Sequence, residues 1–232
     1  VTGFALGDIS ATNGIVSALS GSGATYTFTV TPVLQGLAGV WIPASVAQDA
    51  AGNWNTISTG LTRTYDSVPP GVTLSSAAAN PTNVSPIAVT ATFTENVTGF
   101  ASGDISVGNG TVSNFAGSGT TYTFDVTPSA QGLVTVNISA GVAQDAAGNG
   151  NTAATQLSRT YDSTPPTVSL TSSAPDPANA AFSVTATFSE AVTGLALGEI
   201  SVTNGTASSL SGSGTTYIFT VTPTADGLVS VS

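Results

Sequence analysis

The chain has 232 residues and a net charge of −10, and its only cationic side chains are Arg63 and Arg159. It lacks Cys and His, which excludes disulfides, Cys-based metal sites and the usual general base of enzymes. This acidic balance argues against nucleic acid or an anionic membrane as a partner, and no apolar run reaches the roughly 20 residues of a membrane-spanning helix. We therefore expect no membrane insertion in this segment and no enzyme.

The sequence repeats itself. The tetrapeptide at Val1–Phe4 returns 96 residues later at Val97–Phe100 and, with Leu in last place, after another 95 residues at Val192–Leu195. A period of this length suits a whole small domain, so we expect tandem modules. The chain begins and ends within a module, which indicates a window from a longer protein. The expected domains are a partial repeat at 1–66, a complete repeat at 67–162 and a partial repeat at 163–232.

In the complete repeat, apolar and polar residues alternate in short runs, which is typical of strands. Two runs show the pattern clearly, with Val89, Ala91 and Phe93 on one face of the first and Tyr122, Phe124 and Val126 on one face of the second. The segments expected as strands are, in chain order, 72–75, 87–94, 105–107, 111–115, 121–126, 134–138 and 153–161.

The connections between these runs favour antiparallel pairing. Asn109-Gly110 and Gly117-Ser118-Gly119 are hairpin signals, because they supply the positive φ of tight turns. Seven short antiparallel strands in one repeat predict an all-β fold, an immunoglobulin-like or fibronectin-III-like seven-stranded β-sandwich, with the sandwiches in a linear array. The pairs Pro69-Pro70 and Pro165-Pro166 predict short, stiff linkers between modules.

At this point the chain resembles a known family. Phe93–Phe100, Gly103–Ile105, Val142–Asn149 and Tyr161–Pro166 look like the bacterial Ig-like repeats of very large surface-anchored or secreted proteins. The resemblance implies an extracellular location on a bacterial surface and a role as a spacer or in adhesion. It says little about activity, because such repeats serve adhesins, stalks, sheaths and enzyme appendages alike.

Acidic residues recur at equivalent places in the copies. The recurring sets are Asp8, Asp104 and Glu199; Asp49 and Asp145; Asp66 and Asp162; and Glu95 and Glu190. Because successive loops of an antiparallel sandwich alternate between its poles, we expect Glu95, Asp104 and Asp145 at the N-terminal pole of the complete repeat. A short linker brings Asp66 to the same pole. Asp162, Glu190 and Glu199 would form the corresponding set at the next junction.

Clustered carboxylates without His or Cys suit Ca²⁺ better than Zn²⁺ or Cu²⁺. We therefore predict interdomain Ca²⁺ that stiffens the array. The segment Asp145–Asn149, repeated at Asp49–Asn53, is similar to a calcium-binding segment of cadherins. The alternative is plain turn chemistry in these loops, with Arg63 and Arg159 pairing with the nearby Asp66 and Asp162.

The sequence therefore predicts a structural or adhesive repeat region of an extracellular bacterial protein or fibre, which extends, links or assembles into filaments. The expected partners are neighbouring repeats or other copies of the chain, and surface glycans or proteins. The alternative is a glycan-binding or spacer module attached to a secreted enzyme. Aromatic residues such as Trp54, which only the first copy has, are the main candidates for a glycan contact.

Overall fold

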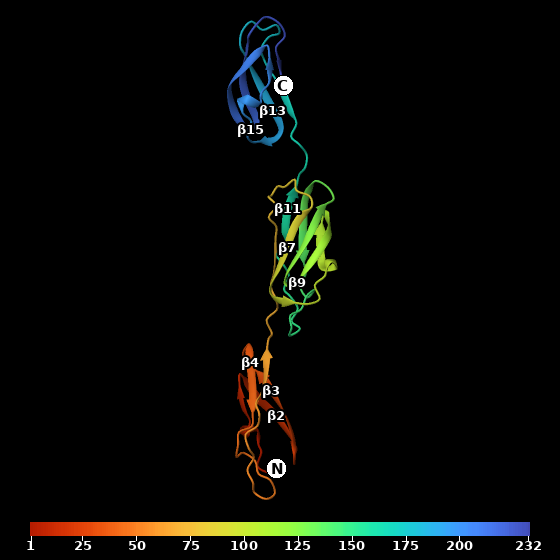
Figure 1. The fold of residues 1–232 in the computed structure, drawn as a ribbon, viewed down its shortest axis with the longest axis vertical. Helices are drawn as coiled ribbons and strands as arrows, with labels where there is room; N and C mark the ends of the chain where they lie inside the picture. The colour runs from red at the N-terminus through yellow and green to blue at the C-terminus, as the bar shows by residue number, and fades with distance from the viewer. The chain divides into compact units, whose positions relative to one another are not determined.

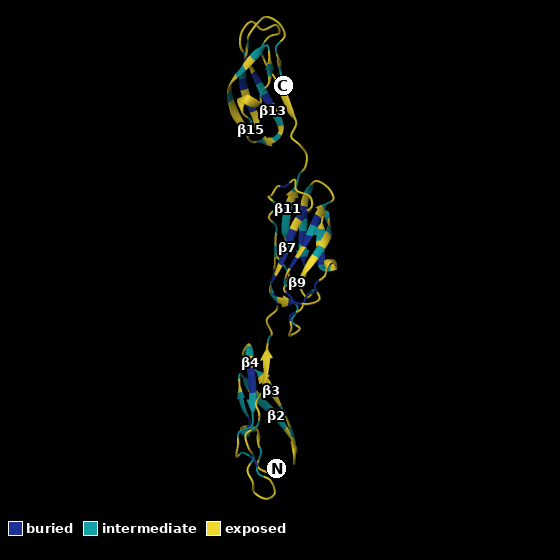
Figure 2. Cartoon of the chain, in the orientation of Figure 1, coloured by how far each residue is buried: buried dark blue, intermediate teal, exposed yellow.

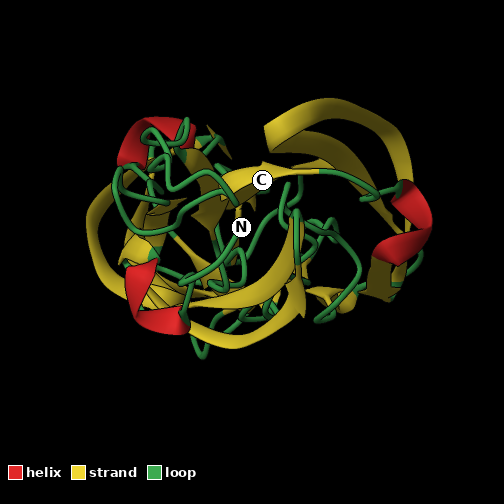
Figure 3. Ribbon diagram, turned by 90° about the horizontal axis from the view of Figure 1, so that it is seen from below, coloured by secondary structure: helices red, strands yellow, loops and turns green.

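Strands form almost all of the regular structure in the computed structural model, which describes residues 1–232 in full. Figure 3 shows these strands with three short helical turns between them. None of these turns has the length and apolarity of a membrane-crossing helix. The chain forms two compact units, Val1–Asp162 and Ser163–Ser232.

The first unit holds the first copy and the complete middle copy. In the first copy the elements are η1 (Leu6–Asp8), β1 (Ser10–Thr12), β2 (Gly14–Ser22), β3 (Thr25–Pro32), β4 (Gly36–Trp41) and β5 (Leu61–Tyr65). In the middle copy they are β6 (Val72–Ser75), β7 (Ile87–Val97), η2 (Ser102–Asp104), β8 (Ile105–Gly108), β9 (Gly110–Pro128), β10 (Gly132–Ile138) and β11 (Leu157–Tyr161).

The middle copy is a sandwich of two sheets. One has the order β6-β7-β9 and the other β11-β10-β8, with antiparallel neighbours throughout. In Figure 1 this copy runs from yellow through green to cyan, and β7, β9 and β11 are labelled on it. The segment after β6 crosses to the second sheet, where Thr82 forms a parallel bridge with Tyr161.

The long strand β9 contains two of the expected strands. Contacts between its two halves show that it folds back on itself. The Asn114 amide donates to the Asp125 carboxylate at 2.8 Å, and the Phe115 ring stacks on Tyr122 with centroids 5.7 Å apart. In the first copy the equivalent strands, β2 and β3, are a paired hairpin. The middle copy therefore has the seven predicted strands, arranged as in a constant-type immunoglobulin sandwich. Several bounds differ from the prediction. β7 extends to Val97, β8 extends to Gly108 and β10 begins at Gly132, whereas β11 begins only at Leu157 and one element spans 110–128.

The core of the middle copy consists of the inward faces of both sheets. Phe124, Val126 and Ala91 have 2% or less of their surface exposed, as the alternation predicted. The Phe100 ring packs edge to face on Phe93 and Tyr122, with centroids 5.3 Å and 5.1 Å away. Such aromatic pairs contribute about 0.5–1.5 kcal/mol each beyond the area they bury. In Figure 2 the buried residues are correspondingly dense on β7 and β9.

The partial copies contain subsets of the same sandwich. The first copy has the sheets β1-β4-β5 and β2-β3. The second unit consists of the third copy, in which β12-β13-β15 form one sheet and β14-β16 the other. Its elements are β12 (Val168–Thr171), β13 (Phe182–Val192), η3 (Leu197–Glu199), β14 (Val202–Thr203), β15 (Gly205–Pro223) and β16 (Ser230–Val231).

A residue with left-handed backbone conformation recurs in the same edge segment of every copy. Ala18, Asn114 and Ser209 occupy equivalent positions and have φ of 53°, 52° and 56°. In the first copy the pairing of β2 with β3 shifts between Ser17 and Ser20, where this residue lies. A bulge twists an edge strand away from regular pairing, so the first copy carries a built-in obstacle to edge-to-edge aggregation.

We expect Phe124→Ala to lower the free energy of unfolding of the middle copy by about 3–5 kcal/mol, because the fully buried ring leaves a cavity. Phe28→Ala, the equivalent change in the first copy where the ring is only half-buried, should have a smaller effect. Denaturant titration followed by circular dichroism and by tryptophan fluorescence separates the two, because both Trp residues lie in the first copy. Equal losses at the two positions would contradict this description of the core.

Candidate functional site: the junction between the first and middle copies

The loop after β10 is closed by one carboxylate. Asp145 Oδ1 accepts hydrogen bonds at 2.8 Å from the backbone N–H of Ala147 and of Asn149, and Oδ2 accepts at 2.8 Å from the Asn149 amide. The Asp145 N–H also donates to the Asn149 carbonyl at 3.1 Å. This is the turn chemistry that favours Asp, Gly and Asn in such loops. It fixes the direction in which the Asn149 amide points.

The first copy has the same turn at Asp49–Asn53. Asp49 Oδ1 accepts from the N–H of Ala51 and Asn53, and Oδ2 accepts from the Asn53 amide, all at 2.9 Å. Asp49 is exposed, whereas Asp145 is only 6% exposed. The turn therefore forms without a neighbouring repeat beside it.

Two loops meet at this pole, as the alternation of loops predicted. The segment after β7 and the loop after β10 pair through Thr98 and Gln144, which exchange N–H···O bonds of 2.7 Å and 3.0 Å. The same contact joins Thr2 and Gln48 in the first copy. This pairing brings the end of β7, with Glu95, next to the Asp145 loop.

The linker from the first copy passes beside this pole and is bonded to it. The Asn149 amide donates to the Asp66 carbonyl at 3.2 Å, and the Thr152 N–H donates to the Pro70 carbonyl at 2.9 Å. Thr94 holds Gly71 from the other side, since its Oγ accepts from the Gly71 N–H and its own N–H donates to the Gly71 carbonyl, both at 2.9 Å. Pro70 is fully buried. The second Pro of the pair is thus packed into the next repeat.

The first copy also holds the linker. Gln35, in the turn before β4, donates from Nε2 to the Ser67 hydroxyl at 3.0 Å and accepts from the Ser67 N–H at 3.2 Å. The Asp66 carboxylate accepts from the Val68 N–H at 3.0 Å. Partners from both repeats therefore fix the linker between β5 and β6. We call this segment, residues 66–71, the strap.

Three carboxylates converge where the strap meets the loops. Oxygens of Asp66, Glu95 and Asp145 all lie within 4.8 Å of one another. Asp66 and Glu95 are half-buried and Asp145 is buried. An ionised carboxylate offers about four acceptor positions, of which Asp145 uses three and Asp66 uses one. Glu95 has no such donors, so most of the free acceptor capacity lies on Glu95 and Asp66.

The electrostatics of the group differ from member to member. Burial, with the charges of Asp145 and Asp66, raises the pKa of Glu95 above its ordinary value. Burial alone would also raise the pKa of Asp145, but the hydrogen bonds from Asn149, Ala147 and Gly148 outweigh it and lower that pKa. In the first copy the hydrogen bonds from Asn53 are the main cause that lowers the pKa of Asp49. Glu95 is therefore the member whose charge the junction tolerates least.

One of the four carboxylates expected to cluster at this junction bonds to its own turn instead. Asp104 Oδ2 accepts from the Ala101 N–H at 2.8 Å and caps the 3-10 turn η2. Asp8 caps η1 through Ala5 at 2.7 Å, and Glu199 caps η3 through Ala196 at 3.0 Å. This recurrence therefore reflects a local backbone requirement, because the first N–H groups of a helical turn lack partners within the turn. Asp104 is therefore not one of the three clustered carboxylates, and a metal role for it stays a prediction.

The predicted second set is divided between the two compact units. Asp162 closes the first unit and Glu190 lies in β13 of the second, and both are half-buried. A metal site formed by Asp162, Glu190 and Glu199 stays a prediction. So does a metal role for Asp8 and for Asp49, which in the first copy is engaged in its own turn.

The two arginines bind backbone carbonyls. Arg159 donates to the carbonyls of Ala78, Ser76 and Ser158 at 2.9, 3.0 and 2.8 Å. Arg63 donates to the Thr62 carbonyl at 2.8 Å. Arg159 thus fastens β11 to the segment after β6. The expected pairing of Arg63 with Asp66 is replaced by a bond within β5.

Sequence reasoning missed two polar side chains at the junction, Asn151 and Gln35. The Asn151 side chain, 2% exposed, accepts from the Ala143 N–H and donates to the carbonyls of Ser139 and Thr152. Asn55 has the equivalent role in the first copy, where its Oδ1 accepts from the N–H groups of Val46 and Ala47. Their identical place in the two copies was the available signal, as it was for the acidic residues. Gln35 had no comparable signal, because its role depends on where the linker passes.

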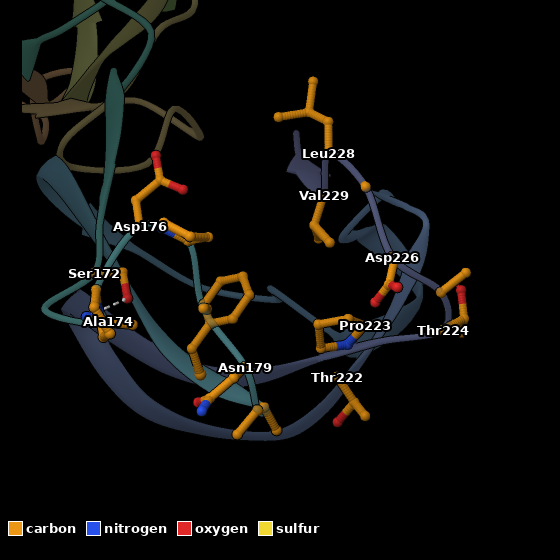
Figure 4. A pocket seen from close by; sticks show the side chains of 18 residues that line it. Ser172, Ala174, Asp176, Asn179, Thr222, Pro223, Thr224, Asp226, Leu228 and Val229 are labelled. Carbon is orange, nitrogen blue, oxygen red and sulfur yellow. Dashed lines mark hydrogen bonds between the residues drawn. The ribbon is translucent and has the colours of Figure 1, made fainter.

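An open cavity of about 1000 Å³ lies in the third copy (Figure 4). Ser172 and Ala174 line one side of it, and Leu228 and Val229 lie opposite. Ser172 and Ala174 correspond to Ser76 and Ala78, whose carbonyls accept from Arg159 of β11 in the middle copy. The cavity is thus the position that β11 fills in the complete repeat, and it gives no reason to expect a ligand.

The two sheets, the folded-back β9 and the pole-to-pole linker define a tandem immunoglobulin-like protein. A family profile described as bacterial Ig-like domain matches residues 1–65, 66–161 and 162–231. The chain therefore belongs to the bacterial Ig-like domain family, in three tandem copies. Among solved structures it is similar to invasin, a bacterial integrin-binding protein, with 14% identity and a TM-score of 0.39. That match covers 96% of this chain and 48% of the invasin chain, so this chain spans about half of it. No curated protein matches the sequence.

Glu95→Gln should stabilise the cation-free protein at neutral pH, because a carboxylate whose folded pKa is raised binds more protons folded than unfolded. The cost of ionised Glu95 is fully present above its folded pKa and disappears as pH falls below its unfolded value. The gain in thermal midpoint, measured in EGTA, should therefore shrink as the pH is lowered through that window. Asp226→Asn, at an exposed position, is the control and should leave the midpoint unchanged. A pH-independent gain would refute the electrostatic explanation.

Proposed function

We propose that this chain is a structural and adhesive repeat region of an extracellular bacterial protein or fibre, in which each repeat acts as a spacer. Its junctions hold successive repeats in a fixed relation, and calcium stiffens them. Membership of the bacterial Ig-like domain family and the tandem copies support this role. A chain without His or Cys, whose acidic residues are used in turns, caps and a junction, supports a non-enzymatic module.

The single observation that carries the proposal is the strap between β5 and β6. Gln35 bonds it to the first copy, and Asn149 and Thr152 bond it to the middle copy. An unsupported linker would let two domains reorient, since relative motion is the default for small interdomain contacts. A linker with a buried Pro and partners on both sides restricts that motion, which is the property a spacer requires.

The carboxylates are the reason to propose Ca²⁺. Ca²⁺ takes six to eight oxygen ligands at about 2.3–2.6 Å, often with water among them. Glu95 and Asp66 offer most of the free acceptor positions, and Asp145 has one left on Oδ2. The three side chains are thus a partial coordination set, to be completed by water or backbone oxygens. A cation there would neutralise the repulsion that raises the pKa of Glu95.

Turn chemistry and a cation are compatible at this junction. The hydrogen bonds of Asp145 explain why its turn has the same geometry as the turn at Asp49, so the turn itself needs no ion. They do not account for Glu95, which brings a third charge to the group without a donor of its own. The calcium proposal therefore depends mainly on Glu95.

In Ca²⁺, the thermal midpoint of the 232-residue chain should rise above its value in EGTA, since a ligand that binds only the folded junction stabilises it by mass action. A hundredfold excess of free Ca²⁺ over Kd corresponds to about 2.7 kcal/mol. Differential scanning calorimetry at neutral pH measures both states.

Glu95→Gln should change the thermal midpoint in opposite ways without and with Ca²⁺. The variant should be more stable than the unmodified chain in EGTA and should show little response to Ca²⁺. Asp226→Asn should respond to Ca²⁺ as the unmodified chain does. A midpoint that ignores Ca²⁺, or a Glu95→Gln variant that keeps the full response, would refute a calcium site at this junction.

The strap itself is tested without calcium. The double variant Asn149→Ala and Thr94→Val removes bonds from the linker, so X-ray scattering should show a broader distribution of interparticle distances within the chain. Asn53→Ala, which opens the same turn in the first copy, is the matched control and should leave that distribution unchanged. A double variant as stiff as the unmodified chain would show that the hydrogen bonds do not restrict the junction.

A further inference from the structure

The strap is bonded to an Asn that is followed by Gly. Asn149 precedes Gly150 in the middle copy, whereas in the first copy the equivalent Asn53 precedes Trp54. We propose that Asn149 is a site of spontaneous deamidation, and that its conversion to a carboxylate changes the strength and the cation demand of the junction. The part that concerns cations rests on the proposed function.

The local geometry leaves the attacking group available. Gly150 forms a bridge with Gln144, but its flanking hydrogen bonds run from the Asp145 N–H to Asn149 and from the Asn151 N–H to Ala143. The Gly150 N–H is therefore not used in the bridge. Gly150 also lacks a side chain that would hinder its nitrogen, and both residues are only half-buried, so water reaches them.

The reaction needs only water. The deprotonated Gly150 amide nitrogen attacks Cγ of Asn149, a C–N bond forms, and the side-chain nitrogen leaves as ammonia after taking up a proton. One water molecule then opens the five-membered succinimide at either carbonyl, which gives aspartate or isoaspartate at position 149. The net change is the gain of one water and the loss of one ammonia, without an oxidant or a cofactor.

Deamidation would act directly on the strap. The Asn149 amide donates both to the Asp66 carbonyl at 3.2 Å and to Asp145 Oδ2 at 2.8 Å. A carboxylate at this position donates to neither and adds a fourth negative charge beside Asp66, Glu95 and Asp145. Without a cation the junction is weakened by repulsion. With Ca²⁺ the new oxygens are further ligands, so the same change increases the dependence of the junction on the cation.

The first copy supplies the matched comparison. Asn53 has the same turn and the same bond to its Asp as Asn149. The bulky Trp54 takes the place of Gly150, so succinimide formation at Asn53 should be slower. Any difference between the two positions therefore reflects the following residue and the junction, with the turn itself held constant.

The experiment incubates the 232-residue chain at mildly alkaline pH and maps its chymotryptic peptides by mass spectrometry, with chromatographic separation of the aspartate and isoaspartate forms. Conversion at position 149 should exceed that at position 53 several-fold. Trp54→Gly should raise conversion at position 53 to a comparable rate. This gain is the more reliable test, because a Cβ in Gly150→Ala would lie 3.2 Å from the Gly141 Cα and would disturb the loop. Equal, slow conversion at both positions in both proteins would overturn the modification site.

Asn149→Asp tests the consequence separately. Its thermal midpoint should lie below that of the unmodified chain in EGTA, and the rise on addition of Ca²⁺ should be larger. Asn53→Asp is the control and should not enlarge that rise. If Asn149 deamidates but Asn149→Asp shows no larger Ca²⁺ response, the calcium-dependent consequence is overturned while the modification site stands. If Ca²⁺ stabilises the chain but Asn149 does not deamidate, the modification site is overturned while the proposed calcium function stands.

Discussion

The closure of the Asp145 loop on its own backbone is the interaction on which the junction depends. By accepting three hydrogen bonds, the Asp145 carboxylate fixes five residues in a turn and aims the Asn149 amide at the linker. Hydrogen bonds to an ionised acceptor are stronger than neutral ones, and here they also keep a buried acid ionised. The buried Pro70 and the bond from Thr152 then find a surface whose shape is already set.

The Asp145 carboxylate also adds a negative charge to a group of carboxylates that repel one another. A chain with only two cations places three carboxylates within 4.8 Å of one another, and the arginines bind carbonyls elsewhere. Like charges held close destabilise the folded state unless protons or a cation neutralise them. The raised pKa of Glu95 is the sign of that tension. The stability of the contact between these two repeats therefore depends on pH and on cations.

The sequence predicted the fold well because its signals are local. Alternation identified the inward faces of β7 and β9, and the glycines at 117 and 119 identified the reversal within β9, where their φ values are 120° and 65°. The poles at which loops gather followed from antiparallel topology alone. Asp104 was placed in the cluster because sequence does not show whether an acid bonds to its own turn, as this one does to Ala101. Gln35 was missed because the path of the linker is a tertiary property.

The comparison of the first and middle copies explains how such an array can be extended. The Asp49 turn has the bonds of the Asp145 turn although no linker lies against it in this structure. The loop is thus preorganised, and docking a linker on it orders the linker alone, which lowers the entropic cost of forming the junction. Contacts in tandem repeats are then those between nearest neighbours, so stability accumulates junction by junction. A substitution in one loop should affect one junction, which allows repeats such as the first and middle copies to diverge in sequence at Trp54 and Gly150 while they keep the same turn.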